Sequence, residues 1–223
     1  MSPSHTIDEV ASAYNQWSKT YESVENLTRD LSAAVLRRLP LSLLHGDILE
    51  IGCGTGLNSR YLAQHSKSLL ALDFSAGMLA EARVNLSGTR AGFAQRDIRQ
   101  GWPLAAASVD LVVCSLVLEH IEDLDPIFKE AARVLRPGGE FFVCEYHPFC
   151  QLMGSQARFT DEASGDLILI PAYLHDVSDY LNTALENRFE IRRIDEWRDE
   201  SDSSALPPRL LSLRLQTPAD DTG

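Results

Sequence analysis

Long apolar runs, a secretion signal and paired cysteines are all missing from this 223-residue sequence. No apolar run approaches the ~20 residues that a membrane-spanning helix needs, and the first residues lack the basic and apolar regions of a signal peptide. The four cysteines form no C-x-x-C pair and join no His/Cys cluster with metal-ligand spacing. These absences predict a cytoplasmic protein with reduced, buried thiols, no membrane association and no metal site.

Positive charge is also scarce. The chain has 20 Lys and Arg against 32 Asp and Glu, which gives a formal net charge of −12. A field of that sign repels a phosphate backbone, and the largest basic grouping, at Arg188, Arg192 and Arg193, is interrupted by Glu190. We therefore expect no nucleic-acid partner, and a small molecule as the substrate.

Alternating strand and helix patterns fill most of the chain and predict one α/β domain over residues 1–223. Apolar strands are expected at 48–51, 68–73, 109–115 and 140–145, with a weaker one at 92–97. A hairpin is expected within 146–175, a helix near 178–187, and two further strands near 189–197 and 209–217. The last strand alternates leucine with polar residues, which predicts a half-exposed antiparallel strand near an edge.

Three glycines, Gly52, Gly54 and Gly56, follow the first expected strand at alternate positions. Without Cβ atoms the backbone can turn sharply and approach a ligand, and the next helix offers free N–H groups. A dinucleotide fingerprint needs glycine at the sixth position, where this chain has Leu57, and the Gly-Lys-Ser/Thr ending of a P-loop is absent. The loop therefore argues against a nicotinamide cofactor, although packing alone could also explain its glycines.

Carboxylates end the next two expected strands, at the sheet edge where open α/β folds bind ligands. Asp73 can accept hydrogen bonds from both hydroxyls of a ribose; the alternative is a charge that complements the dipole of the next helix. Asp97 could accept from an adenine amino group, with Ile98 against the ring. A turn role, or a salt bridge to Arg96 or Arg99, is the alternative there.

Together these segments resemble the class I S-adenosylmethionine-dependent methyltransferases, in the type 11 branch that acts on small molecules. Residues 50–56 (EIGCGTG) are similar to the first motif of the family, and Asp73 and Asp97-Ile98 match its ribose and adenine positions. Residues 110–121 and 133–139 resemble its fourth-strand motif and the turn into its fifth strand. The resemblance implies a Rossmann-like seven-stranded sheet, mostly parallel and flanked by helices, with the last strand antiparallel.

The resemblance also implies a cofactor, S-adenosylmethionine, that becomes S-adenosylhomocysteine when its methyl group passes by in-line displacement to O, N or C of a small-molecule acceptor. The residues expected to bind this cofactor are Tyr14, Tyr21, Arg29, Glu50, Gly52, Cys53, Gly54, Gly56, Asn58, Asp73, Phe74, Met78, Asp97, Ile98, Ser115, Leu116 and His120. The two tyrosines resemble a paired-tyrosine signature of the branch, with Asn15 and Glu22 in place of its usual aspartates. Packing on the sheet is the alternative for both rings.

His147 is the candidate general base, because it follows the fifth strand and histidine titrates near physiological pH. A histidine that caps a turn is the alternative. Residues 1–45 are expected to form an N-terminal helical cap, and residues 146–187 a substrate cover.

Two other functions compete with this enzyme. A non-catalytic domain that binds S-adenosylmethionine or S-adenosylhomocysteine could serve as a sensor or partner subunit. A nucleic-acid base methyltransferase would usually carry an Asn/Asp-Pro-Pro-aromatic motif, where this chain has Ser115-Leu116-Val117.

Overall fold

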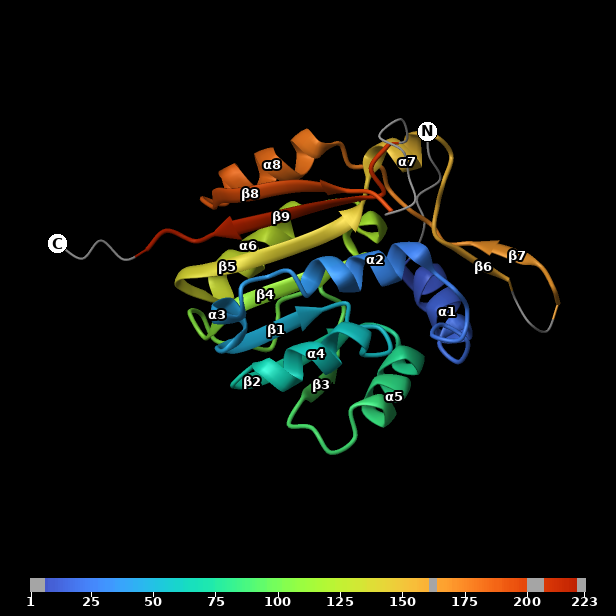
Figure 1. Cartoon of the computed structure of the whole chain (residues 1–223), viewed down its shortest axis with the longest axis horizontal. Coiled ribbons are helices and arrows are strands. Elements are labelled where there is room, and N and C mark those ends of the chain that lie inside the picture. Colours follow the sequence, from blue (N-terminus) through green and yellow to red (C-terminus); the bar gives the residue numbers. More distant parts are fainter. Residues whose placement is uncertain (1–6, 161–163, 200–206, 220–223) are drawn as a thin grey trace.

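A seven-stranded sheet in the order β3-β2-β1-β4-β5-β9-β8 forms the centre of the protein (Figure 1). The computed structural model describes residues 7–160, 164–199 and 207–219. The strands of this sheet are β1 (Asp47–Ile51), β2 (Ser68–Asp73), β3 (Gly92–Gln95), β4 (Val109–Ser115), β5 (Leu135–Tyr146), β8 (Glu190–Trp197) and β9 (Leu210–Gln216). Only β9 runs against its neighbours in this sheet, pairing antiparallel with both β5 and β8. The predicted fold is thereby confirmed, including the reversed last strand.

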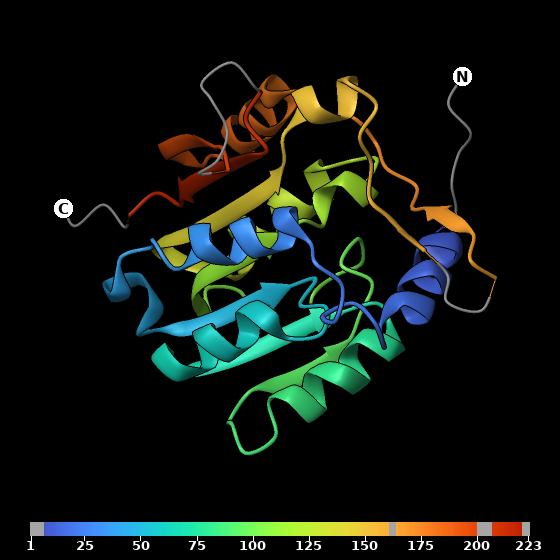
Figure 2. The same cartoon turned by 45° about the vertical axis from the view of Figure 1, so that its right-hand side comes forward.

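Helices cover both faces of the sheet (Figures 1 and 2). One face packs against α2 (Leu27–Leu36), α3 (Leu41–Leu44), α4 (Leu57–His65) and α5 (Ala76–Asn85). The other packs against α6 (Asp125–Val134) and α8 (Val177–Glu186), with the 3-10 turn η1 (Leu118–His120) after β4. Because both faces are covered, β1 and β4 are apolar on both sides, which is why continuous apolar runs marked these strands in the sequence.

The last strand differs from the sequence prediction in its exposure. We expected β9 to be half-exposed, but its residues from Leu210 to Leu213 are buried. The strand lies one position inside the sheet, and β8 forms the edge beside it. On the polar side, Ser212 Oγ accepts a hydrogen bond from the indole of Trp197 on β8, at 2.8 Å. The alternation of leucine with polar residues in β9 therefore does not mark a face exposed to water. The polar side chain of Ser212 is instead covered by a side chain of the neighbouring strand β8.

A second, smaller layer lies beyond the carboxyl ends of the parallel strands (Figures 1 and 2). It contains α1 (Ile7–Trp17), α7 (Pro148–Leu152) and the antiparallel pair β6 (Arg158–Thr160) and β7 (Leu167–Leu169). Helix α1 and the β6–β7 pair share their own apolar cluster, in which the rings of Trp17 and Phe159 stack at 5.3 Å. This layer therefore ties the start of the chain to a segment about 140 residues later.

The predicted cap and cover are only partly in this layer. Of the expected cap at residues 1–45, α1 lies there, whereas α2 and α3 bury Val35, Leu36 and Leu44 against the sheet. Of the expected cover at residues 146–187, α8 likewise packs on the sheet through Tyr180 and Ala184.

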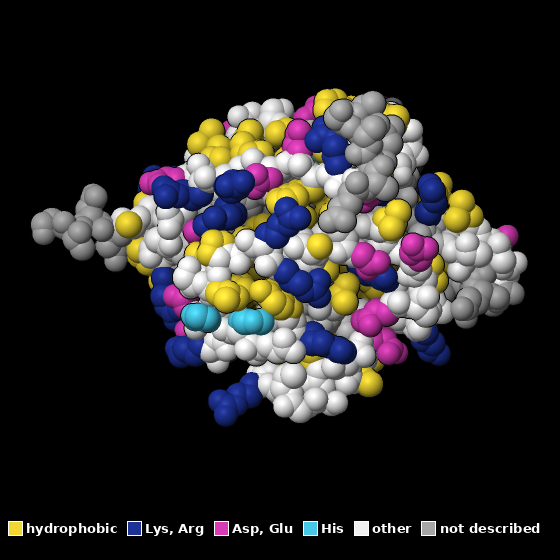
Figure 3. Space-filling view, in the orientation of Figure 1, with side chains coloured by type: hydrophobic (Ala, Val, Ile, Leu, Met, Phe, Trp, Pro, Cys, Tyr) yellow, Lys and Arg dark blue, Asp and Glu magenta, His cyan; other side chains and the backbone are white. Residues whose placement is uncertain are grey.

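Charge on the molecular surface is mixed. Figure 3 shows the face that carries α2 and α4, where Lys and Arg side chains are dispersed among apolar and acidic ones. Among the described residues, no helix has both the length and the apolar character that crossing a bilayer requires.

Candidate active site

A cavity opens where β1, β2 and β4 end, and we call it the glycine-loop cavity. All of the sequence-predicted cofactor residues line it except Gly56, Asp97 and Ile98. Asp97 and Ile98 line a small recess that shares Gly52, Asp73 and other wall residues with this cavity. The fold therefore gathers nearly all of these positions at one rim of the sheet, as the strand-end argument predicts.

The three glycines of the loop have different reasons to lack a side chain. Gly52 has φ +69°, and a Cβ there would lie 2.2 Å from Val117 Cγ2. Gly56 has φ +89° at the N-terminus of α4, and its Cβ would lie 2.5 Å from Leu86 Cδ1. Gly54 also has a positive φ, but a Cβ there would meet nothing within 4 Å. Gly54 thus leaves backbone open to the cavity, whereas Gly56 is explained by packing under α5.

Asp73 lies at the centre of this rim, in the walls of both the glycine-loop cavity and its recess. Its side chain is buried and accepts hydrogen bonds from the backbone N–H groups of Gly54 and Ser75, each at 2.8 Å. Burial raises its pKa to about 6 even though these donors favour the charged form. Since a carboxylate offers about four acceptor positions, capacity remains for two hydroxyl groups of a ligand.

The wall of the cavity also contains a second buried acid and several polar atoms without partners in the described residues. Burial raises the pKa of Glu50 to about 8, although the hydroxyl of Ser59 donates to its carboxylate. Thr55 Oγ1, Asn58 Oδ1 and Ser115 Oγ are buried and have no hydrogen-bond partner in the described residues. Buried polar atoms are almost always paired, so these three indicate a polar ligand that completes the wall.

The recess beside Asp73 contains an ion pair that the sequence left as an alternative. Asp97 Oδ2 lies 2.8 Å from Arg99 Nη2. Burial raises the pKa of Asp97, but the hydrogen bonds from Arg99 outweigh it and hold the pKa below its usual value. Arg96, which the sequence reasoning did not select, also lines the recess, and its Nε atom is buried without a partner in the described residues. Its place beside Asp97 in the sequence was the available signal.

The two tyrosines of the N-terminal segment line the cavity rather than the sheet. Tyr14 Oη lies 2.8 Å from His120 Nε2, and His120 Nδ1 lies 2.7 Å from the carbonyl oxygen of Pro171. Since a carbonyl can only accept, we assign the proton of the neutral ring to Nδ1, and the Tyr14 hydroxyl then donates to Nε2. The Arg29 guanidinium lies 5.6 Å from the centre of the Tyr21 ring and donates to the Tyr21 carbonyl.

A second cavity, which we call the cover cavity, lies beneath α1 and β6 and has a volume of about 330 Å³. It shares Tyr14, Tyr21 and Leu116 with the glycine-loop cavity. Its other wall residues are Trp17, Glu25, Asn26, Leu27, Thr28, Glu119, Tyr146, Ser155, Gln156, Ala157, Arg158 and Arg209. The two cavities therefore meet along a wall of two tyrosines and a leucine.

The sequence reasoning missed most of the cover cavity. Glu119 stood inside the matched fourth-strand motif, beside the selected His120, and that position was the one signal for it. Arg158 and Arg209 carried none, because they lie far apart in the sequence and meet only through the fold.

His147, the sequence candidate for a general base, lines neither of the two cavities. Its side chain is fully buried at the N-terminus of α7, where Nδ1 accepts from the N–H of Phe149 and Nε2 faces Glu196 Oε1, both at 3.2 Å. Burial lowers its pKa, which favours the neutral ring. This geometry matches the capping alternative, and the base role remains a prediction.

Comparison with known proteins finds similarity to methyltransferases. Residues 49–143 match the family model of the type 11 methyltransferase domain. A malonyl-[acyl-carrier protein] O-methyltransferase of Enterobacter lignolyticus is 37% identical over 130 residues, which are 58% of this chain and 50% of that protein. The "Uncharacterized methyltransferase AN0656" of Emericella nidulans is 29% identical over an alignment 229 residues long, gaps included. The alignment covers 85% of this chain and 79% of that one.

The fold has close counterparts among solved structures. The structure titled "DhpI-SAM-HEP complex" has a TM-score of 0.74 and 22% identity, and the match covers 96% of this chain and 99% of that one. The chain spans about half the length of most curated relatives that it matches. The match over residues 49–143 confirms the predicted resemblance to the type 11 S-adenosylmethionine-dependent methyltransferases, and the shared fold agrees with it.

Proposed function

We propose that this protein transfers the methyl group of S-adenosylmethionine to O, N or C of a small molecule that binds in the cover cavity. The observation that carries the proposal is the shared wall of Tyr14, Tyr21 and Leu116, along which that cavity meets the glycine-loop cavity. A methyl donor in one cavity and an acceptor in the other would lie next to each other beside these residues. In-line transfer requires the acceptor atom to reach the methyl carbon directly, which adjoining cavities allow.

The residues of the glycine-loop cavity fit the donor molecule part by part. Asp73 would accept from the two ribose hydroxyls, while Asp97 and Ile98 in the recess would contact adenine. The unpartnered atoms of Asn58 and Ser115 would bond the polar end of the methionine part. When bound, this cofactor supplies a methyl group already activated by the sulfonium.

The protein then contributes mainly by holding the donor and the acceptor in position. Helix α1 lines both cavities through Tyr14, and residues 155–158 line the cover cavity, so these segments would help to exclude water. Pro171, within this cover segment, accepts from His120, and His120 bonds Tyr14 in turn, which fixes the shared wall. Holding two reactants in line in this way can supply roughly 7–11 kcal/mol of the barrier.

The relatives are methyltransferases by name, which supports methyl transfer, but their names point to different acceptors or pathways. They include a malonyl-[acyl-carrier protein] O-methyltransferase and a ubiquinone biosynthesis O-methyltransferase. A non-catalytic sensor remains the second candidate. The cover cavity favours the enzyme, because a sensor of the cofactor alone needs no second cavity beside it.

The test begins with calorimetric titration of S-adenosylhomocysteine into the purified protein. It continues with a mass-spectrometric screen of small molecules incubated with S-adenosylmethionine that carries a deuterated methyl group. We expect saturable binding, and at least one product heavier by that methyl group. Failure to bind S-adenosylhomocysteine would overturn the proposal. Binding without any product across a broad screen would favour the sensor.

A further inference from the structure

Glu119 is a buried acid in the wall of the cover cavity, and the methyl-transfer proposal gives it no role. Its side chain is only 7% exposed. It lies in the 3-10 turn η1, which directs three consecutive side chains to three places. Leu118 is buried in the core, Glu119 lines the cover cavity, and His120 lines the glycine-loop cavity. One short turn thus contributes an ionisable group to each side of the shared wall.

The carboxylate of Glu119 has fewer hydrogen bonds than its burial requires. From the described residues it accepts one, from Gln151 Nε2 of α7, at 3.3 Å. Its Oε1 atom lies 3.9 Å from His120 Nε2, beyond hydrogen-bond distance. A buried charged group is stable only when it is paired or well hydrogen-bonded. Glu119 therefore has unused acceptor capacity facing a cavity.

A second buried acid, Glu145, lies near Glu119. Glu145, at the end of β5, is fully buried, and its pKa is raised to about 8 by burial and by the negative charge of Glu119. At neutral pH Glu145 is therefore mostly protonated, so it does not compete with Glu119 for a donor from the acceptor.

The position of Glu119 also suits the reacting atoms. Tyr14 lines both cavities and lies 2.8 Å from the same His120 Nε2 that is 3.9 Å from Glu119 Oε1. The carboxylate is therefore close to the place where the two cavities meet and the methyl group would be transferred. The backbone of Glu119 is tied to the cover segment, since the N–H of Tyr173 donates to the Glu119 carbonyl at 2.6 Å.

We propose that Glu119 accepts the hydrogen bond, and in the transfer step the proton, of an O–H or N–H group on the acceptor. The substrate class is then an alcohol, a phenol or an amine. The inference rests on the proposed methyl transfer. The acceptor's oxygen or nitrogen forms a bond to the methyl carbon as the carbon–sulfur bond breaks. Its proton passes to the carboxylate, and S-adenosylhomocysteine leaves without the sulfonium charge.

The same geometry disfavours the other acceptor types. A carboxylate acceptor has no proton to give and would be repelled by the charge on Glu119 at short range. A carbon nucleophile supplies no hydrogen-bond donor for the unused acceptor position. The acceptor with a polar hydrogen is the one that completes this wall.

Three probes of equal size test the inference: phenethylamine, 2-phenylethanol and phenylacetate. They share an aromatic ring and differ in the terminal group, so only that group can explain a difference. Each is titrated by saturation-transfer NMR into the protein saturated with S-adenosylhomocysteine. We expect the alcohol and the amine to bind, and phenylacetate to bind at least ~10-fold more weakly. If the uncharged alcohol binds as well as the amine, attraction between Glu119 and a positive charge cannot by itself explain the binding.

The variant Glu119→Gln should weaken the alcohol and amine probes by ~10-fold. Glu122→Gln is the matched control, because it removes the same charge from an exposed position three residues later and should change neither probe. A retained thermal shift with S-adenosylhomocysteine checks that each variant folds. If Glu119→Gln does not fold, Glu119→Asp, which withdraws the carboxylate from the cavity, decides by the same titrations.

Two outcomes would overturn the inference. One is phenylacetate binding as tightly as the alcohol. The other is unchanged binding of the alcohol and the amine in the folded Glu119 variant. Either result, together with normal S-adenosylhomocysteine binding, would leave the proposed methyl transfer intact. Loss of S-adenosylhomocysteine binding in the unmodified protein would instead overturn the methyl transfer itself.

Discussion

The parallel strands of the central sheet begin at one side of the molecule and end at the other, and we call these sides the amino edge and the carboxyl edge. Acidic side chains at the two edges have opposite electrostatic surroundings. At the amino edge, Asp47 accepts from Ser68 Oγ at 2.8 Å, from Lys67 Nζ at 3.1 Å and from Arg136 Nη2 at 3.1 Å. Arg136 also pairs with Asp110, at 2.7 Å. The hydrogen bond from Ser68, followed by that from Lys67, lowers the pKa of Asp47.

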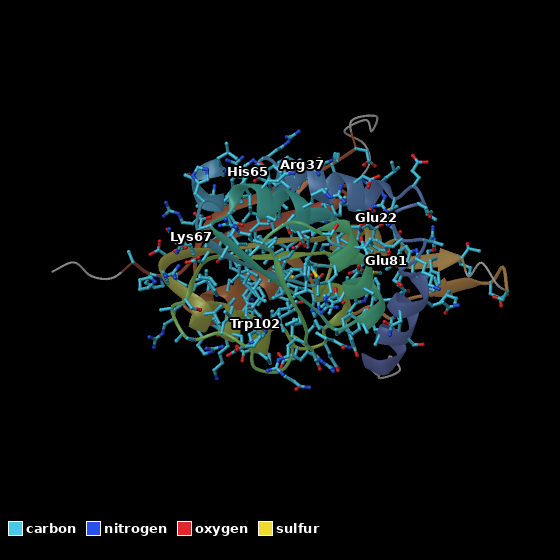
Figure 4. All side chains as sticks on the ribbon, turned by 90° about the horizontal axis from the view of Figure 1, so that it is seen from below. Glu22, Arg37, His65, Lys67, Glu81 and Trp102 are labelled. Atoms are coloured by element: carbon cyan, nitrogen blue, oxygen red, sulfur yellow. The ribbon has the colours of Figure 1, made fainter. Side chains whose placement is uncertain are left out.

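At the carboxyl edge, the acids at the ends of β1, β2 and β5 have pKa values raised mainly by burial. These values are about 8 for Glu50, about 6 for Asp73 and about 8 for Glu145. The two edges lie at different ends of the molecule. In Figure 4, Lys67 and His65 lie toward one end, and Glu22 and Glu81 lie toward the other. Charges at the amino edge are paired within the protein, whereas the buried acid Asp73 at the carboxyl edge retains capacity for a ligand, although Asp97 there is paired with Arg99. The difference marks the functional edge.

The sharpest test of this difference removes one acid from each edge. Asp73→Ala should weaken S-adenosylhomocysteine binding by at least ~100-fold, because two hydrogen bonds to a charged group are worth about 3 kcal/mol together. Asp47→Ala removes the same charge at the amino edge and should leave the affinity unchanged. Calorimetric titration of both variants measures the contrast. Equal losses would mean that the two edges do not differ in function.

The pH dependence of stability should reveal the same contrast. Glu50 and Glu145 bind protons in the folded protein up to about pH 8, whereas in the unfolded chain they lose them near pH 4.5. The folded state therefore holds more protons between these limits, so its free energy of unfolding must fall as pH rises. From about pH 6 to about pH 8 we expect each glutamate to remove about 1–2 kcal/mol.

Denaturant unfolding of the ligand-free protein at the two pH values measures this slope. Glu50→Gln, which cannot ionise, should flatten it, and Asp47→Asn should not, since the lowered pKa of Asp47 places its titration below this window. A stability that rises between pH 6 and 8 would contradict the raised pKa values.

Cofactor affinity should follow pH in the opposite direction to stability. S-adenosylmethionine brings a positive sulfonium and an ammonium into the cavity lined by Glu50 and Asp73, so binding favours the ionised acids and releases protons. Its affinity should therefore drop by ~10-fold from about pH 8 to about pH 6. S-adenosylhomocysteine, without the sulfonium charge, is the matched ligand and should show a smaller drop. Titration in buffers of different ionisation enthalpy counts the protons released, and no release would contradict the assignment.

The sequence identified the carboxyl edge better than the layer above it. Strands β2 and β4 have the residues predicted for them, because buried parallel strands leave unbroken apolar runs. Asp73 followed from such a strand, since its place at the strand end is a local property. The cover cavity is not local: Glu119 and Arg209 reach its wall from elements that only the fold brings together.

His147 is a residue that the sequence selected without indicating its surroundings. Its position after β5 suggested a catalytic group, but its surroundings depend on Glu196 from the edge strand β8 and on the short helix that it caps. The cap was the alternative that the sequence offered, but the contact with Glu196 leaves no signal near residue 147. Sequence reasoning could therefore name the residue without knowing which way its ring would face.

The smallest expected effect concerns the amino edge alone. Asp47→Asn keeps the size of the side chain but removes the charge that faces Lys67 and Arg136. Lys67 is 72% exposed, and ion pairs at such positions contribute about 0–1 kcal/mol. We expect denaturant unfolding to reveal a loss within that range, with unchanged affinity for S-adenosylhomocysteine. A loss of several kcal/mol would mean that the paired edge, too, depends on buried charge, and the contrast between the edges would then lie in ligand binding and not in how each acid is stabilised.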